Sequence, residues 1–240
     1  MSSERATDPI RTLAIVACLL ALAGCATPTQ RQTPELRRDA ARIPKVVVMP
    51  MDVELMQITA GGLQEPHSEW TEQALKHMRA ALEAEAARRK VEIVDFHPER
   101  GTPEDRETSI DLVKLHRAVG GAVLLHQYVP GLELPSKQGK FDWSLGPGAA
   151  AISRSHAADY ALFVFVRDSY ATAGRVAVII VGALLGAGVP GGSQVGFASV
   201  VDLKTGDIVW FNRLVRPTGD LRTPDAAAET VKALVSDAMQ

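Results

Sequence analysis

The chain has 240 residues, of which 46% are hydrophobic and 22% are charged, and its formal net charge is −2. This length is enough for one domain with a good core plus an additional segment. The charge balance shows no clustered basic face, which argues against a nucleic-acid-binding protein. Of the two cysteines, only Cys25 follows the apolar N-terminal stretch, so no disulfide is expected within one processed chain.

The N-terminus carries the most informative motif of the chain. A short head with basic residues precedes an uncharged run over residues 12–24, which ends in Leu22-Ala23-Gly24-Cys25. A basic head, an apolar run and small residues before a cleavage point follow the order of a secretory signal. The pattern resembles the signal and lipobox of bacterial lipoproteins, which implies that residues 1–24 are removed and that Cys25 is acylated. A plain secretory signal or a membrane helix is the alternative, but a spanning helix needs about 20 apolar residues.

Residues 25–44 are expected to connect the acylated cysteine to the folded domain. They contain three prolines, four arginines and few apolar side chains. This composition predicts a flexible tether with an average reach of about 25 Å. The enterobacterial sorting rule, applied by resemblance, implies the outer membrane and its periplasmic face, because Ala26 stands where an acidic residue would favour retention in the inner membrane.

Residues 45–240 are expected to form a single α/β periplasmic domain. KVVVMP at 45–50 predicts a buried strand that the proline ends, and residues 53–66 are interpreted as a loop. Apolar residues at helical spacing predict a helix to about Arg89 that begins with Ser68 as its cap. The alternating run VEIVDF at 91–96 predicts a second strand.

A second helix is predicted from residues 102–105 to about Gln127. It continues through Gly120-Gly121, although each glycine costs roughly 1 kcal/mol relative to alanine. Residues 130–148 are rich in glycine and proline and predict a long loop, followed by a short helix over 149–157. DYALFVFVR at 159–167 is apolar on both faces, as expected for a central strand that helices cover on both sides.

The C-terminal part predicts a hairpin and a last helix. Two β-rich runs at 195–203 and 207–215 flank Lys204-Thr205-Gly206, where glycine can adopt the positive φ of a turn. Thr223 is expected to cap a helix that has Pro224 at its first position. The order β-α-β-α-β-insert-β-β-α predicts an α/β fold with a mixed sheet, helices on its faces and a C-terminal hairpin plus helix.

The insert, residues 176–189 (VAVIIVGALLGAGV), has no charged or polar side chain. It is too short to span a bilayer, which needs roughly 17 residues or more, so we expect a short helix. Burial within its own domain, contact with a second subunit or partner, and shallow membrane contact are the alternatives. Gly182 and Gly186 would share one face and let another helix approach closely, which favours partner contact and a homo-oligomer.

Four segments carry a resemblance to known proteins. They are 45–50, 91–95, 158–162 and the hairpin over 200–210, whose Lys-Thr-Gly turn and strand ending in Trp210 are the most specific. In this order, behind a lipobox, they resemble a group of periplasmic lipoprotein domains. The group includes the curli secretion lipoprotein, the outer-membrane activators of penicillin-binding proteins and the N-terminal domain of the Tol translocation protein. The resemblance carries no catalytic residues, and it implies a non-enzymatic assembly, secretion or regulatory role.

Motifs for catalysis or metal binding are absent from the sequence. The six histidines include no pair at i, i+4, and neither Gly-x-Ser-x-Gly nor Ser-x-x-Lys occurs. The glycine-rich stretch 186–192 lacks the lysine of a phosphate-binding loop. We therefore predict no metal, no cofactor and no enzymatic activity, and a hydrolase without a recognisable motif is the remaining alternative.

Phe141 and Trp143 stand out because they lie in the long loop, and loops run over the surface. They either fold back over the core or serve as aromatic anchors for a partner. The expected function is that of an outer-membrane lipoprotein, anchored through Cys25, that binds another envelope protein. A subunit of an oligomeric secretion or transport assembly is the alternative, but a pore built from strands is disfavoured because residues 175–189 do not alternate between apolar and polar.

Overall fold

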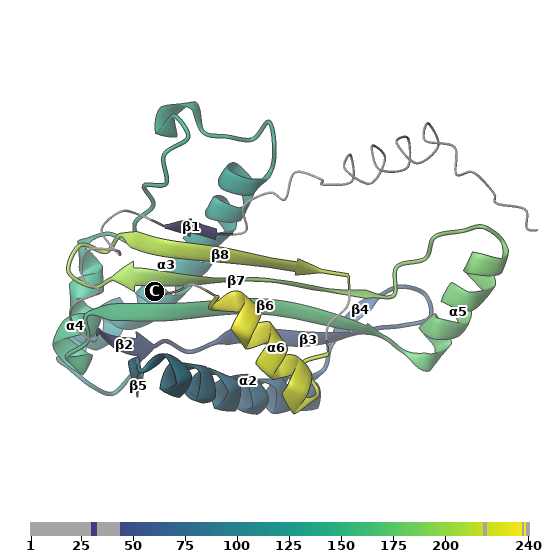
Figure 1. Cartoon of the computed structure of the whole chain (residues 1–240), viewed down its shortest axis with the longest axis horizontal. Coiled ribbons are helices and arrows are strands. Elements are labelled where there is room, and N and C mark those ends of the chain that lie inside the picture. Colours follow the sequence, from purple (N-terminus) through teal and green to yellow (C-terminus); the bar gives the residue numbers. More distant parts are fainter. Residues whose placement is uncertain (1–29, 33–43, 218–219, 237, 239–240) are drawn as a thin grey trace, which may run out of the picture.

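The computed structural model describes residues 30–32, 44–217, 220–236 and 238. The expected signal peptide, the lipobox cysteine Cys25 and most of the expected tether therefore lie outside the described residues. The described chain is built on one mixed sheet of eight strands in the order β1-β8-β7-β6-β2-β5, with β3 beside β6 and β4 beside β3. Figure 1 shows the long strands of this sheet, with helices packed on it and α5 standing beyond one end.

The elements follow the predicted order, with additional strands. The strands are β1 (Gln30–Gln32), β2 (Lys45–Val48), β3 (Asp52–Ile58), β4 (Gln64–Pro66), β5 (Glu92–Asp95), β6 (Tyr160–Ala171), β7 (Gly192–Asp202) and β8 (Ile208–Arg216). The helices are α2 (Ser68–Arg89), α3 (Pro103–Tyr128), α4 (Ala150–His156), α5 (Ala173–Leu184) and α6 (Pro224–Leu234), with short 3-10 turns at Pro135–Lys137 and Pro147–Ala149. The predicted α/β fold with a mixed sheet is confirmed.

Strand β6 lies in the middle of the sheet and is longer than the sequence predicted. One of its edges pairs antiparallel with β7, from Tyr160 opposite Asp202 to Tyr170 opposite Gly192. Its other edge pairs in parallel with β2 and then with β3, which lie end to end along it. Its first five residues are all buried, as expected for a strand with helices on both faces.

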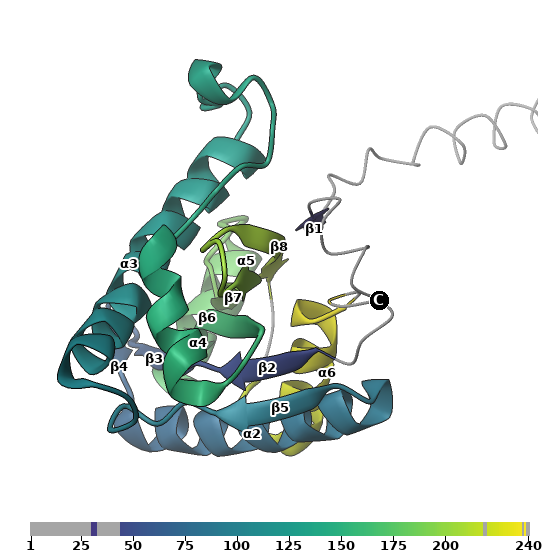
Figure 2. The same cartoon turned by 90° about the vertical axis from the view of Figure 1, so that its left-hand side faces the viewer.

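Helices cover both faces of the sheet (Figures 1 and 2). On one face, α2 and α6 bury residues such as Met78 and Val231 against a cluster that contains Trp210. On the other face, α3 and α4 pack on a cluster that contains Phe163 and Phe197. The fully buried aromatic residues of the strands therefore hold the two helical layers to the sheet.

The predicted loop over residues 53–66 is wrong, because this segment forms β3 and β4. Val53, Leu55 and Ile58 are buried and the residues between them are less so. This arrangement lets β3 pair with the second half of β6, which extends beyond the strand predicted from the sequence. Pro50 ends β2, but the chain resumes a parallel course along β6 two residues later.

Helix α3 continues through Gly120-Gly121, as predicted, and the structure gives the reason. A Cβ atom at Gly120 would lie 2.3 Å from the ring of Phe197. The glycine therefore lets the helix approach the aromatic side chains of the sheet closely, which outweighs its low helix propensity.

One predicted helix cap is wrong, and the other is confirmed in its position only. The N-cap of α2 is His67, whose Nδ1 accepts a hydrogen bond from the backbone of Trp70 and whose ring stacks on that indole. Ser68 is the first residue of the helix instead. Thr223 is the N-cap of α6 by position, but its side chain makes no capping hydrogen bond.

Part of the expected tether is a strand. The backbone of β1 pairs antiparallel with β8, with Gln30 opposite Asn212 and Gln32 opposite Trp210. Residues 30–32 therefore belong to the sheet, and the rest of the expected tether up to residue 43 lies outside the described residues. The amphipathic pattern on which strand prediction depends is absent from this polar segment, so the sequence did not reveal it.

The predicted β7–β8 hairpin is confirmed, and Gly206 in its turn has a φ of +84°. Its backbone also lies against the end of the long loop: the amide of Leu145 donates to the Gly206 carbonyl at 2.8 Å. A Cβ atom at this position would lie 2.0 Å from the carbonyl oxygen of Gly146. The turn therefore requires glycine for two reasons, its φ angle and this close contact.

We predict that Gly206→Ala destabilises the chain by about 2 kcal/mol or more, because positive φ alone costs roughly 1–2 kcal/mol and a backbone collision adds to it. Gly139→Ala is the matched control, since Gly139 also has positive φ but nothing lies within 4 Å of its Cβ position. Chemical unfolding of both variants measures the difference. Equal destabilisation would contradict the proposed contact with Gly146.

Candidate functional site

The most unusual surface belongs to α5, which lies in the connection between β6 and β7. Both strands extend past the helices that cover the sheet, and α5 stands at their far end (Figure 1). Thr172 caps the helix, with its side-chain oxygen accepting a hydrogen bond from the Arg175 amide. The predicted short helix is confirmed.

The apolar side chains of α5 are exposed rather than buried. No residue of this helix is buried, and Leu184 and Leu185 are each 81% exposed. The other large exposed residues here are Val176, Val178, Ile180 and Val181. Burial within its own domain, the simplest of the sequence-based alternatives, is therefore wrong. Exposed apolar patches of this kind mark contacts with proteins or membranes.

Gly182 and Gly186 have roles within this segment. Gly186 lies beyond the end of the helix with φ of +75°, and the amides of Gly186 and Ala187 donate to the carbonyls of Ala183 and Gly182. This is the hydrogen-bond pattern of a Schellman motif, which favours glycine. A Cβ atom at Gly182 would lie 2.8 Å from the Val189 side chain. The expectation that these glycines form one open helical face, at which another helix approaches closely, is therefore wrong. Their contact with a partner stays a prediction.

The base of α5 is held firmly. The Arg175 guanidinium donates to the Pro190 carbonyl from Nε at 3.2 Å and from Nη2 at 3.1 Å, which joins the two ends of the segment. The Thr172 amide donates to the Ile58 carbonyl at 3.0 Å. The segment is therefore an extension of the sheet with its own internal hydrogen bonds.

A second projection is formed by the end of α3 and the loop over 129–142, and it is called the α3 arm below. Figures 1 and 2 show it standing clear of the sheet. Its loop is fixed by an ion pair of 2.7 Å between Lys137 and Asp142 and by a hydrogen bond of 2.6 Å from His126 to the Leu132 carbonyl. Its exposed aliphatic side chains are Leu125, Val129 and Leu132.

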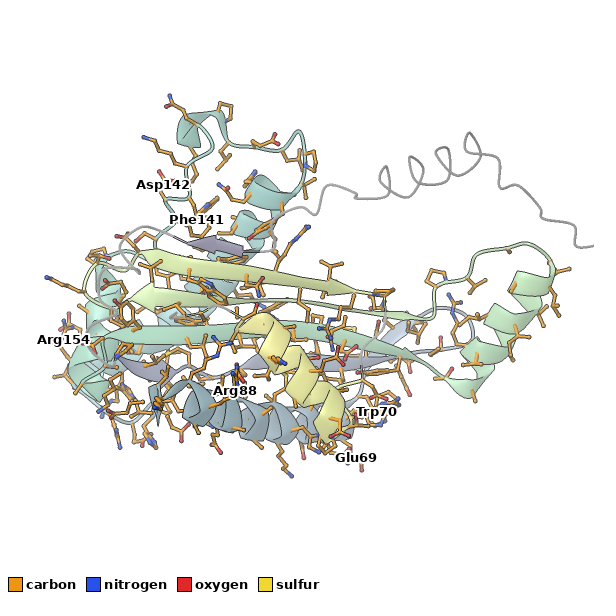
Figure 3. All side chains as sticks on the ribbon, in the orientation of Figure 1. Glu69, Trp70, Arg88, Phe141, Asp142 and Arg154 are labelled. Carbon is orange, nitrogen blue, oxygen red and sulfur yellow. The ribbon has the colours of Figure 1, made fainter. Side chains whose placement is uncertain are left out.

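Phe141 lies on the returning limb of this loop (Figure 3), and Trp143 follows it, where its carbonyl accepts a hydrogen bond of 2.8 Å from the Ile208 amide. Both are partly buried against the cluster of the α3 face. The Phe141 ring lies 6.4 Å from that of Phe211, and Lys137 lies 4.4 Å above the Trp143 ring. Of the two interpretations from sequence, folding back over the core agrees with this packing; contact with a partner through these two residues stays a prediction.

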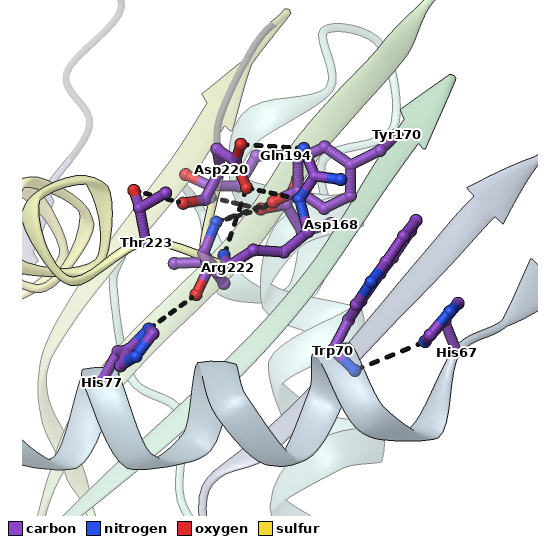
Figure 4. Close-up of polar contacts among 10 residues, drawn as sticks. His67, Trp70, His77, Asp168, Tyr170, Gln194, Asp220, Arg222 and Thr223 are labelled. Carbon is purple, nitrogen blue, oxygen red and sulfur yellow. Dashed lines mark hydrogen bonds and ion pairs between the residues drawn. The ribbon is translucent and has the colours of Figure 1, made fainter. Parts of the chain in front are cut away.

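A buried polar network joins β6 and β7 to the C-terminal segment (Figure 4). The Asp168 carboxylate accepts hydrogen bonds from the Tyr170 hydroxyl and, at 2.9 Å, from the Gln194 amide. The backbone amide of Leu221 donates to Tyr170 at 2.7 Å, and Thr230 of α6 donates to Gln194 at 3.1 Å. Burial raises the pKa of Asp168 and also that of Tyr170. These side chains are buried, and their hydrogen bonds connect α6 to the sheet.

A serine and a histidine also meet, unpredicted, beneath α3. His116 Nε2 and the Ser199 hydroxyl share a hydrogen bond of 2.6 Å. Ser199 is 0% exposed, and the imidazole stacks on Phe163 with ring centroids 4.1 Å apart. Burial lowers the pKa of His116 to about 3, so the imidazole is neutral. A nucleophile must reach its substrate, and this buried pair satisfies two polar groups inside the core instead.

An open groove of about 630 Å³ lies at the carboxyl ends of β2 and β5. In open α/β sheets this is the usual place for a ligand. Its lining includes Met49 and Phe96, and Arg79 pairs with two lining carboxylates, Glu83 at 2.8 Å and Asp95 at 2.7 Å. The groove therefore has space and apolar area for a ligand. The charge of Arg79 is already paired, so it is not free to select one.

The described residues contain no cluster of three or more side chains suited to hold a metal ion. Within the same ranges, no helix is long and apolar enough to cross a membrane. The sites identified from sequence are thus separated: Phe141 and Trp143 lie at the root of the α3 arm, Gly182 and Gly186 lie in and after α5, and Cys25 lies outside the described residues.

Comparisons with known proteins give no family. No family model matches the chain, and no curated protein matches it. A solved PelC dodecamer from Paraburkholderia phytofirmans is similar at 16% identity over 87% of this chain and 97% of that chain, with a TM-score of 0.35. The LpoB C-terminal domain from Salmonella enterica is similar at 15% identity over 75% of this chain and 88% of that chain, with a TM-score of 0.27.

LpoB is a penicillin-binding protein activator lipoprotein, one of the groups that the sequence segments resemble. The LpoB C-terminal domain from Escherichia coli is also similar, at 12% identity over 83% of this chain and 92% of that chain, with a TM-score of 0.22.

The buried network predicts a pH dependence. Because the pKa of Asp168 is raised, the folded chain binds this proton more tightly than the unfolded chain. The resulting stabilisation is fully present below the unfolded pKa of about 3.9 and is lost as pH rises through the folded pKa. We expect the free energy of unfolding of the wild type, minus that of Asp168→Asn, to fall as pH rises from this value.

Asp220→Asn is the control, because a hydrogen bond from Arg222 lowers the pKa of Asp220. Its stabilisation is present at higher pH and is lost as pH falls through the folded pKa. The two stability differences should therefore change with pH in opposite directions. Unfolding curves across this range measure them, and parallel slopes would contradict the assignment of the network.

Proposed function

We propose that this chain is a lipid-anchored, non-enzymatic contact protein of the bacterial cell envelope. In this proposal Cys25 carries the acyl chains, and the domain lies on the periplasmic face of the outer membrane. One observation carries it: large exposed apolar side chains gather on two projections, α5 and the α3 arm, whereas the buried polar networks join secondary-structure elements to each other. Such a distribution suits binding to other molecules better than catalysis.

The α3 arm is the proposed binding surface for an envelope protein. Its loop is held in place by the Lys137–Asp142 ion pair, so little conformational freedom is lost when a partner binds. Exposed Val129 and Leu132 would form its apolar centre. The Trp143 ring lies beneath Lys137 of the same loop, 4.4 Å from its ammonium nitrogen.

Acylation is tested first. Two acyl chains bind membranes stably, whereas one chain is marginal, since each buried CH₂ contributes about 0.8 kcal/mol. We expect Cys25→Ser to leave the outer-membrane fraction and to change its electrophoretic mobility. Cys18→Ser is the matched control, because Cys18 lies in the apolar run and not in the lipobox. A Cys25→Ser variant that stays in the outer-membrane fraction and keeps the wild-type electrophoretic mobility would disprove the anchor.

Partner binding is tested by photo-crosslinking in intact cells. A photoreactive amino acid at Val129 or at Leu132 should give the same discrete adduct, because both side chains are exposed on one arm. Lys90, exposed at the end of α2, is the control position and should give none. Leu132→Asp should remove the adduct formed from Val129. Adducts that are equal at all three positions would count against the α3 arm as a specific surface.

A homo-oligomeric assembly is the second candidate function, and the outer edge of β8 favours it. Strand β1 covers only Trp210–Asn212, so Arg213–Arg216 has no strand partner on that side among the described residues. Val215 is 66% exposed and lies opposite the exposed Val195. Unpaired edges of this kind can pair with another chain. A particle mass that falls to the monomer in Val215→Lys would support this candidate, and a monomeric wild type would exclude it.

A further inference from the structure

The exposed surface of α5 surrounds most of the helix instead of forming one stripe. Successive residues of an α-helix are rotated by about 100°. Arg175, Ile179 and Gly182 are the more covered positions and share one narrow side, which faces the returning segment 187–191. The exposed positions, which include Val176, Val178, Ile180, Val181, Leu184 and Leu185, occupy the remaining directions. A flat protein surface would cover only part of this circumference, whereas lipid chains can surround it.

No side chain of this segment needs water as a hydrogen-bond partner. Residues 176–192 have no charged or hydrogen-bonding side chain. The Thr172 side chain accepts from the Arg175 amide at the start of the helix, and the amides of Gly186 and Ala187 donate to carbonyls at its end. Internal pairing of the backbone is the condition for placing a chain in lipid. The single charge, on Arg175, lies at the base of the helix, where it bonds the Pro190 carbonyl.

The chain to the lipid anchor is long enough to extend most of the way toward the same end of the molecule. Gln30 is the end of β1 nearer to α5, because it pairs with Asn212, and Gln32 pairs with Trp210. The chain from Cys25 to Gln30 spans at most about 18 Å. Asn212 pairs with Ala198 of β7. Along β7, Ala198 lies about 20 Å from Gly192, where the chain returns from α5.

We propose that α5 inserts into the lipid bilayer as a second membrane contact beside the acyl chains of Cys25. This inference rests on the acylation proposed above. A helix of twelve residues is about 18 Å long, against a hydrocarbon core of about 30 Å, so α5 enters one leaflet and does not cross. Leu63, exposed in the β3–β4 turn next to the base of α5, widens the apolar contact. Two contacts fix the orientation of the domain, which a lipid on a tether alone leaves free.

The test uses the full acylated chain in vesicles of phosphatidylethanolamine and phosphatidylglycerol. An environment-sensitive fluorophore is attached at Leu184→Cys, since the mature chain has no other thiol once Cys25 is acylated. We expect emission at shorter wavelength, quenching by spin labels on the lipid tails and protection from iodide. Lys204→Cys, exposed in the turn at the opposite end of the β6–β7–β8 sheet, is the control and should show none of these changes.

Two outcomes would overturn the proposal. Emission typical of water, with full quenching by iodide, would mean that α5 stays outside the bilayer. A shift that appears only at high protein-to-lipid ratio, together with disulfide formation between Leu184→Cys chains, would mean that a second copy covers the helix. Flotation of the same vesicles reports the anchor separately, so chains that float without the Leu184 signal refute insertion and leave the acylation of Cys25 standing.

Discussion

The structure depends on the pairing of one long strand, β6, with three neighbours. Residues Tyr160 to Tyr170 of β6 pair with β7 on one side, and its other side pairs with β2 and then with β3. Its first half is buried between helical layers, where Phe163 meets the α3 face and Leu162 the α2 face. Burying both sides of one strand removes apolar area that a half-covered strand leaves in water. Its register places β2, β3 and β7 directly, and β5, β4 and β8 pair in turn with these three strands.

The length of β6 also creates the apolar surface to which we assign a function. The second half of β6 and the start of β7 extend past α2 and α3, and the chain turns back only at α5. Asp168 and Gln194 lie in this extended part and connect it to α6 through Thr230. The extension is thus supported by a buried network on one side while its end stays apolar and uncovered. A fold with no use for this end would gain stability by shortening the hairpin.

Sequence patterns predicted the helices and strands in which the spacing of apolar residues reflects their burial. They failed where an element depends on contacts between distant parts of the chain. The helix over residues 103–128 and the β7–β8 hairpin follow from apolar spacing and from Gly206, respectively. The strand β1 could not be predicted, because its pairing with β8 is made by the backbone of polar residues. The exposure of α5 was also hidden, since an apolar sequence indicates that a helix avoids water and not what covers it. The Ser199–His116 contact joins residues 83 positions apart, a distance over which one sequence carries no pairing signal.

The central claim is that the apolar end of this molecule is covered in the cell. It is tested most directly by the reactivity of Ile180→Cys toward a membrane-impermeant maleimide that enters the periplasm of intact cells, compared with Lys204→Cys. Our account predicts that Ile180→Cys is unreactive in cells and reacts after detergent solubilisation, whereas Lys204→Cys reacts in both. Equal labelling of the two variants in intact cells would contradict it, because Ile180 would then be as open to water in the envelope as it is in the isolated chain, where it is 56% exposed.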